Sequence, residues 1–220
     1  MGQARPSAST VLDIGIGLMI AWVIVRSKLP GRQVLDSLAM LPLAVPGIVL
    51  AFGYLAISLQ LQTWIGRENV NLRRLVDVTE NPTLLLIVAY AMRRLPYVVR
   101  SAVAGLQQTP ADLELAARNL GASGFLTLRR ITVPLIAANL LAGALLAFAF
   151  AMLEVSDSLI LAQRQAFWPI TKAIYELFQR LGDGPYIASA LGVSATLLLT
   201  LTILSANAFL GKRLGAIFRV

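Results

Sequence analysis

Few residues in this chain could carry chemistry of their own. Its 220 residues include no cysteine and no histidine, which excludes thiolate and imidazole metal sites, haem ligation, disulfides and histidine proton relays within the chain. An intramembrane enzyme would need a nucleophile, an acid or a metal group inside its apolar segments. Those segments offer few ionisable groups besides Asp13, Arg93 and Arg94. The sequence therefore argues against an enzyme.

Two acidic residues, Glu154 and Asp157, follow a long apolar run. Their carboxylates could attract a cation at the outer end of that run, or pair with Arg164. Acidic residues at such a boundary are more often simply solvated. We treat the two residues as a candidate outer gate and assign no metal site to them.

The composition places the chain in a membrane. Hydrophobic residues make up 57% of the sequence and charged residues 14%, and the mean hydropathy is +0.74. A soluble protein of this size would have too little polar surface to cover itself. A transmembrane helix needs about 20 apolar residues, and five runs approach that length. They are residues 8–26, 37–59, 82–101, 132–153 and 187–210.

We therefore expect an all-α integral membrane protein with five transmembrane helices in one domain over residues 1–220. The first run has the length and the basic flank of a signal peptide. However, Asp13 interrupts it early and no small-residue cleavage site follows. We expect this run to be a retained helix.

The formal net charge of +8 could suggest nucleic acid as a partner. The basic residues, however, lie in short clusters at the ends of apolar runs, where topology signals belong. One side of the expected membrane collects 12 of the 19 lysines and arginines. The positive-inside rule then puts the loop at about 105–131 and the C-terminus in the cytoplasm, and the N-terminus outside. We expect lipid around the helices and no nucleic-acid partner.

The expected cytoplasmic loop has local signals for two short helices. Thr109 suits an N-cap and Pro110 suits the first helical position, so a helix should start there. Gly121 permits the left-handed backbone that ends a helix, and a second helix can begin near Ser123. Apolar residues recur between these signals at spacings of three and four, which gives one stripe. They are Leu113, Ala116, Ala117 and Leu120.

Two interpretations of this loop stay open on helix physics alone. Small alanines on an exposed face let another protein approach closely, and Gly121 would set the angle between the two helices, as a coupling element requires. The alternative is an amphipathic helix that lies against the lipid headgroups. Arg118, Arg129 and Arg130 would support that alternative equally well.

The second apolar run contains four residues that interrupt regular helix hydrogen bonding: Pro42, Pro46, Gly47 and Gly53. Such interruptions are tolerated at membrane depth only where protein or a water-filled cavity satisfies the freed groups. These four residues are the candidate pathway lining. A helix kinked only for packing is the alternative, because glycine and proline are common in membrane helices.

An amphipathic outer helix is expected over residues 167–181. Its apolar residues Phe167, Ile170, Ile174, Leu177 and Phe178 have helical spacing. Together with the loop at 60–81, this helix could dock a soluble binding protein, or it could simply pack on the other helices.

The segment 114–121, followed by residues 131–134, resembles the signature loop of the permease subunits of binding-protein-dependent ABC importers, written EAA-x3-G-x9-I-x-LP. Two positions depart from this EAA motif. Leu115 stands where its glutamate belongs, with Glu114 one residue early, and Val133 replaces the leucine before the proline. The matched positions are Ala116, Ala117, Gly121, Ile131 and Pro134.

Further stretches carry the same resemblance, which extends over about residues 10–212. Residues 41–47, residues 93–97 and Glu154 are similar to permeases of the ferric-iron branch of that family. The resemblance implies the type I importer (MetI-like) fold in the inner membrane. Two permease halves then lie side by side, two ATP-binding cassette subunits lie beneath them, and a solute-binding protein docks outside.

The resemblance also implies a function. The chain would form the translocation pathway and couple to a separate ATPase through the loop residues Glu114, Ala116, Ala117, Gly121, Ile131 and Pro134. No Gly-x4-Gly-Lys-Ser/Thr loop is present, so ATP and Mg would be bound by the partner and this chain would carry no cofactor. Ferric iron is the preferred solute, with thiamine, phosphonate, polyamine or an oxyanion as alternatives. A structural subunit of another membrane complex would explain five helices but not the spacing of the loop.

Overall fold

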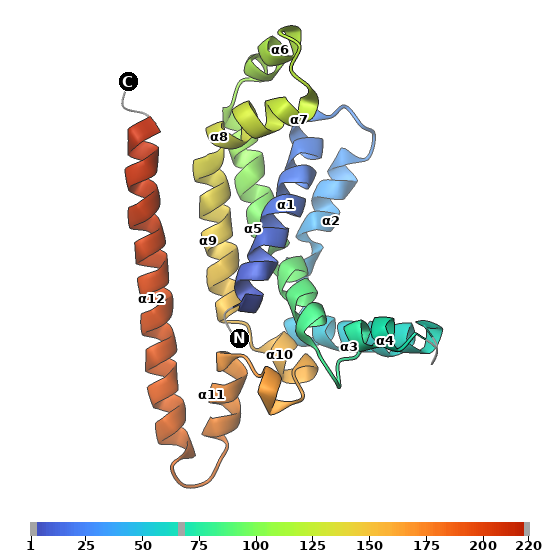
Figure 1. Cartoon of the computed structure of the whole chain (residues 1–220), viewed down its shortest axis with the longest axis vertical. Coiled ribbons are helices and arrows are strands. Elements are labelled where there is room, and N and C mark those ends of the chain that lie inside the picture. Colours follow the sequence, from blue (N-terminus) through green and yellow to red (C-terminus); the bar gives the residue numbers. More distant parts are fainter. Residues whose placement is uncertain (1–3, 66–68, 218–220) are drawn as a thin grey trace.

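The computed structural model describes residues 4–65 and 69–217, and all regular secondary structure in those ranges is helical (Figure 1). The all-α prediction is confirmed. The longer helices are α1 (Ala4–Arg26), α2 (Arg32–Ala44), α3 (Gly47–Ile65), α5 (Thr83–Gln108), α9 (Ala137–Met152) and α12 (Gly184–Ile217). The shorter ones are α4 (Val70–Val76), α6 (Asp112–Asn119), α7 (Gly124–Thr127), α8 (Val133–Leu135), α10 (Ser156–Leu161) and α11 (Ile170–Phe178).

Helices α1, α3 and α12 are long and apolar enough to cross a membrane. A fourth span results if the segments Gly124–Leu135 and Ala137–Met152, which meet at a bend of 76°, form one broken span. This is one fewer than the five expected. The helix that falls short is α5, because its 26 residues include Arg93, Arg94 and Arg100.

The second expected run, 37–59, is not one helix. Helix α2 ends at Ala44 and α3 begins at Gly47, and the intervening Val45 has an extended backbone. Proline disfavours helical backbone in the residue before it, so Pro46 accounts for the break. Figure 1 shows α2 running beside α1, whereas α3 runs across that direction. Pro42 lies inside α2 and Gly53 lies inside α3, so these two residues do not interrupt a helix as expected.

The centre of the molecule is a bundle of α1, α5 and α9, in which α5 has the most buried residues. Glycines allow the three helices to approach closely. A Cβ at Gly17 would lie 2.9 Å from the side chain of Val98, and one at Gly143 would lie 2.7 Å from that of Ser101. Two buried apolar clusters fill the bundle, one around Val99 and Leu140 and the other around Tyr90 and Leu161.

The bundle has two distinct ends. One end carries α6 and α7, and we call it the loop end. The other carries α10 and α11, and we call it the α10 end (Figure 1). Helix α12 packs on α11 and, more lightly, on α9, and its last residues reach the loop end.

The outer helix expected over 167–181 is shorter than predicted. Residues Gln165–Phe167 form a separate 3-10 turn, and α11 begins only at Ile170. The two residues between them, Trp168 and Pro169, have extended backbones, so the helical pattern does not continue through them.

Candidate functional site

The loop helix α6 begins two residues later than the sequence indicated. Thr109 ends α5 rather than starting α6, because its backbone N–H donates to the carbonyl of Leu106 at 3.3 Å and its hydroxyl donates to that of Gly105 at 3.0 Å. The N-cap of α6 is Ala111, whose methyl side chain cannot accept a capping hydrogen bond. Pro110 therefore lies in the connection and not at the first helical position.

The end of α6 agrees with the prediction. Gly121 has a φ of +86°, in the left-handed region where side chains are strained. Its N–H donates to the carbonyl of Arg118 at 2.9 Å, and the N–H of Ala122 donates to that of Ala117 at 3.0 Å. These two bonds form a Schellman motif, which satisfies carbonyls at the helix end. Ser123 then caps α7, because its hydroxyl accepts from the N–H of Leu126 at 3.3 Å.

Glu114 points into its own chain. Its side chain is buried, and its Oε1 accepts hydrogen bonds from Nε of Arg26 at 3.1 Å and from the hydroxyl of Thr132 at 3.2 Å. Arg26 also donates to the carbonyl of Thr109 at 2.7 Å. Glu114 therefore fastens α6 to the end of α1 and to the π-helical turn Leu128–Thr132.

The outward side of the loop carries several exposed apolar residues. Of the expected stripe, only Ala117 is buried, and the other three residues are exposed. Phe125 of α7 adds to this surface, and Leu120 is the most exposed of the set at 89%. We call the four exposed residues the loop face: Leu113, Ala116, Leu120 and Phe125.

The remaining motif residues lie where the loop rejoins the bundle. Ile131 is half-buried in the π-helical turn, and Pro134 is exposed in the first turn of α8. Proline has no N–H to donate, so the helical hydrogen-bond ladder that continues from the π-helical turn lacks a bond at Pro134. The structure thus places Glu114 and Ala117 in α6, Gly121 in the turn that ends it, and Ile131 and Pro134 where the loop rejoins the bundle.

A second constellation lies at the α10 end. Arg93 and Arg94 of α5 both face Glu154, which follows α9: Nε of Arg93 lies 3.5 Å from Oε2 of Glu154, and Nη2 of Arg94 contacts the same oxygen. Nη2 of Arg94 also donates to the carbonyl of Phe150 at 3.0 Å. The other oxygen of Glu154 accepts from the N–H of Ser156 at 3.0 Å, at the start of α10. Glu154 therefore joins α5, α9 and α10.

This constellation differs from two of the expectations for Glu154 and Asp157, which were solvation and pairing with Arg164. Neither residue is solvated, since Glu154 is 5% exposed and Asp157 is 0% exposed. The cations that Glu154 pairs with are arginines of α5, and Arg164 is exposed. The sequence placed Arg93 and Arg94 in an apolar run, but it contained no signal for a partner 60 residues away.

The break between α2 and α3 adjoins the same constellation. The guanidinium of Arg93 occupies the space that a Cβ at position 47 would take, so a side chain there would require Arg93 to move. Of the four candidate pathway residues, Pro46 and Gly47 therefore lie at the break beside the arginines, whereas Pro42 and Gly53 lie within regular helices.

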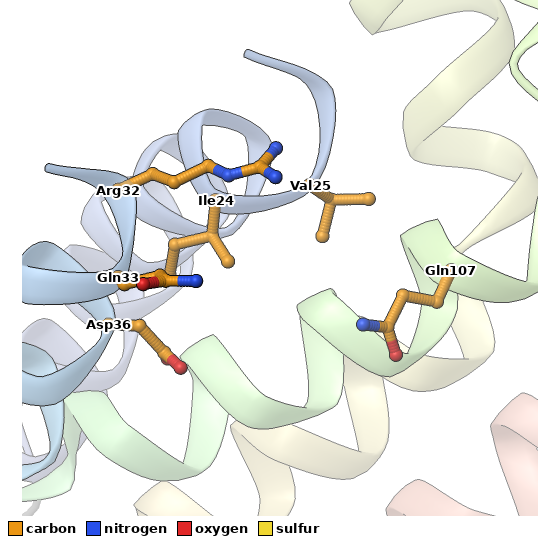
Figure 2. Close-up of a pocket in the computed structure, with 6 residues that line it drawn as sticks. All are labelled: Ile24, Val25, Arg32, Gln33, Asp36 and Gln107. Atoms are coloured by element: carbon orange, nitrogen blue, oxygen red, sulfur yellow. The ribbon is translucent and has the colours of Figure 1, made fainter. Parts of the chain in front are cut away.

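A cavity of about 320 Å³ opens between α1, α2 and α5 near the loop end, and the sequence analysis did not single out its residues. Figure 2 shows polar side chains around it, with the amides of Gln33 and Gln107 on facing walls. Its carboxylate, Asp36, pairs with Arg100 at 3.1 Å. The lining residues are Ile24, Val25, Arg32, Gln33, Asp36 and Gln107.

Comparison with known proteins connects this architecture to transport. A probable sulfate transport system permease protein of Nephroselmis olivacea is 35% identical over 202 residues, which cover 90% of this chain and 68% of that protein. A sulfate transport system permease protein of Salmonella typhimurium is 30% identical over 200 residues, with coverage of 90% and 70%. The molybdenum transport system permease protein of Escherichia coli is 30% identical over 182 residues, with coverage of 80% and 76%.

These matches leave about a quarter to a third of each relative's length without a counterpart in this chain. The family model described as the binding-protein-dependent transport system inner membrane component matches residues 13–215, which is most of the chain. The chain therefore belongs to this family of membrane transport components, whose members are non-catalytic permease subunits.

Proposed function

We propose that this chain is the membrane-spanning permease subunit of an ATP-driven importer, and that its loop face is the surface on which a separate ATP-binding subunit docks. The observation that carries the proposal is an exposed apolar surface on a short helix that is itself fastened to the bundle. Leu120 is 89% exposed on α6, while Glu114 on the same helix is buried against Arg26. Large apolar side chains held rigidly at a surface are typical of an interaction site.

Coupling follows from how α6 is held. A movement of the ATPase subunits would push on the loop face, and the bonds from Glu114 to Arg26 and Thr132 would pass that movement to α1 and to the turn that leads into α9. Coupling between two sites requires an element whose position differs between two global states. The rigid turn at Gly121 lets α6 and α7 act as one such element.

We propose a small oxyanion as the solute. This proposal rests on the relatives, whose names specify sulfate or molybdenum transport. The ferric-iron preference rests on the sequence likeness alone and receives no support from these relatives. Thiamine, phosphonate and polyamine have no observation in their favour.

The proposal includes partners. ATP-binding cassette subunits would bind ATP and Mg, a second permease half would complete the pathway, and a solute-binding protein would dock at the outer side. In the inner membrane we place the N-terminus outside and the loop face in the cytoplasm. This orientation is consistent with the position of the last residues of α12, which reach the end that carries α6 (Figure 1).

Copurification tests the proposal. The tagged chain is extracted from its native membrane in mild detergent, and stoichiometric partners are identified by mass spectrometry. We expect an ATP-binding subunit with the wild type and its loss with Leu120→Arg. The matched control is Leu181→Arg, because Leu181 is 100% exposed and lies near the α10 end, after α11.

Two results would contradict the proposal. Retention of the ATPase by Leu120→Arg would remove the loop face from the interface. Reproducible absence of any ATPase from the folded wild type would favour a structural subunit of another membrane complex.

A further inference from the structure

The α10 end buries more carboxyl groups than it can pair with cations. Three acidic residues and two arginines lie together there, and we call these five residues the charge cluster: Asp13, Arg93, Arg94, Glu154 and Asp157. Electrostatic interactions link them, because the charge of Arg94 acts on both Asp13 and Asp157, and those of Arg93 and Glu154 act on Asp157. Both aspartates are almost fully buried, with Asp13 1% exposed and Asp157 0% exposed.

Glu154 already has its full set of partners. It contacts both arginines and accepts backbone hydrogen bonds from Ser156 and Asp157, so its negative charge is compensated. The two aspartates have none: among the described residues, no group donates a hydrogen bond to any of their four carboxyl oxygens. Nη1 of Arg93 and Nε of Arg94 are also buried without an acceptor.

The charges then do not balance. Two guanidiniums neutralise two carboxylates, and Glu154 is one of them. If Asp13 and Asp157 were both ionised, one negative charge would remain buried without compensation, which is far more costly than protonating one of the two groups. A bound metal ion is a poor alternative, because the described residues include no group of three or more acidic side chains placed to hold one.

We propose that the charge cluster is a proton-binding site, which at neutral pH holds one proton on Asp13 or Asp157 and thereby keeps the α10 end electrically neutral. When that proton leaves, the cluster gains one uncompensated negative charge where α1, α5, α9 and α10 meet. The site is independent of the loop face and of the transported solute. It would make the packing of the α10 end sensitive to pH.

The surroundings of Asp157 support this assignment. Burial, with a further contribution from Glu154, raises the pKa of the Asp157 carboxyl to about 7, although Arg93 and Arg94 oppose the change. Other ionisable groups surround the cluster. Tyr54 of α3 and Tyr90 of α5 interact electrostatically with Asp157, and Arg5 of α1 interacts with Tyr90. Lys172 lies on α11, next to Thr171, whose hydroxyl donates to the carbonyl of Glu154.

None of these groups supplies the missing charge. Arg5 donates to the carbonyl of Phe167 at 2.6 Å and to the hydroxyl of Thr83 at 3.3 Å. Lys172 donates to the carbonyl of Leu159 at 3.0 Å and lies 4.0 Å from Glu176. Both of these cations are therefore engaged with groups other than the aspartates.

Infrared difference spectroscopy of the purified protein tests for the proton directly. We expect a pH-dependent carbonyl band of a protonated carboxylic acid in the wild type. Because one proton serves two residues, the band should vanish in Asp13→Asn and also in Asp157→Asn. A band that merely halves in each variant would mean two separate protons, and a wild type without a pH-dependent band would mean that both aspartates are ionised. Either result overturns the proposal.

Thermal unfolding of the same variants provides a second, independent readout. Each single variant leaves the cluster neutral without a proton, so each should be at least as stable as the wild type at alkaline pH. The double variant Asp13→Asn/Asp157→Asn leaves one arginine without a carboxylate and should unfold at a lower temperature than either single variant. Strictly additive effects would overturn the proposal.

The pH dependence has a defined sign. The Asp157 pKa is raised from 3.8 to about 7 in the folded protein, so the folded state binds more protons than the unfolded state between those values. Stability contributed by this site therefore falls as the pH rises from about 4 to about 7 and levels off above that. Asp157→Asn should remove this fall. If sodium instead of protons restored stability at alkaline pH, the site would hold a cation and the proposal would be wrong.

Discussion

Nε of Arg26, the last residue of α1, donates a hydrogen bond to Oε1 of Glu114 in α6 at 3.1 Å, across 88 residues of sequence. Both side chains are largely buried. The contact attaches α6, at the loop end, directly to α1 of the bundle. It also gives the glutamate nearest the signature motif an internal role, while the neighbouring apolar residues of α6 face outward.

This contact predicts a large stability effect at Glu114. Glu114→Gln leaves the Arg26 guanidinium without its carboxylate, and breaking a buried ion pair typically costs about 3 kcal/mol. We expect a decrease of that order in the free energy of unfolding, measured by chemical unfolding in mixed micelles. Asp112→Asn is the control on the same helix, because Asp112 is exposed and should cost less than about 1 kcal/mol. Equal effects of the two substitutions would contradict the internal role of Glu114.

Gly121 and Gly124 make a matched pair for a test of backbone strain. A Cβ meets nothing within 4 Å at either position, but only Gly121 has a positive φ. Gly121→Ala should therefore lower the free energy of unfolding by about 1 to 2 kcal/mol through backbone strain alone. Gly124→Ala, in α7, should be neutral or stabilising by up to about 1 kcal/mol, since alanine favours helix. If both variants behaved alike in thermal unfolding, the left-handed turn would not be what holds the loop.

Local rules predicted the parts of the loop that depend on a few adjacent residues. The left-handed glycine at 121 and the start of a second helix near Ser123 follow from backbone sterics and short hydrogen bonds, and both are present. The cap at Thr109 was predicted wrongly because α5 extends 7 residues past residue 101, where the third apolar run was expected to end. Thr109 therefore serves as the C-cap of α5. The propensity of a residue for a cap does not say which of two adjoining helices it serves.

The contacts of the α10 end could not be predicted from the sequence. Hydropathy placed Arg93, Arg94 and Glu154 near apolar runs, but pairing across 60 residues depends on how α5 and α9 pack. The same limit applies to the second apolar run, whose prolines and glycines indicated an interruption without locating it. The structure shows that the break lies at Pro46, whereas Pro42 lies within α2 and Gly53 within α3.

Gly47 should accept a side chain only if Arg93 moves. A Cβ there would collide with the guanidinium of Arg93, which lies against the start of α3 and pairs with Glu154. Gly47→Ala should therefore displace Arg93 and lower the free energy of unfolding by about 1 to 3 kcal/mol, as overpacking does in a core. Gly53→Ala is the control within the same helix, because nothing lies within 4 Å of a Cβ at that position. A stable Gly47→Ala variant would show that Arg93 is not held against α3.

Two arginines of α5 allow the effect of burial on the stability of an ion pair to be measured within one helix. Arg94 pairs with Glu154 where both side chains are about nine-tenths buried, whereas Arg100 pairs with Asp36 with about half of its own side chain exposed. Arg94→Gln leaves a buried carboxylate short of one cation and should cost about 3 to 5 kcal/mol. Arg100→Gln removes an exposed pair and should cost about 1 kcal/mol or less. Unfolding in mixed micelles measures both, and comparable losses would mean that water reaches Glu154 and that the α10 end is not the closed, charge-balanced region described above.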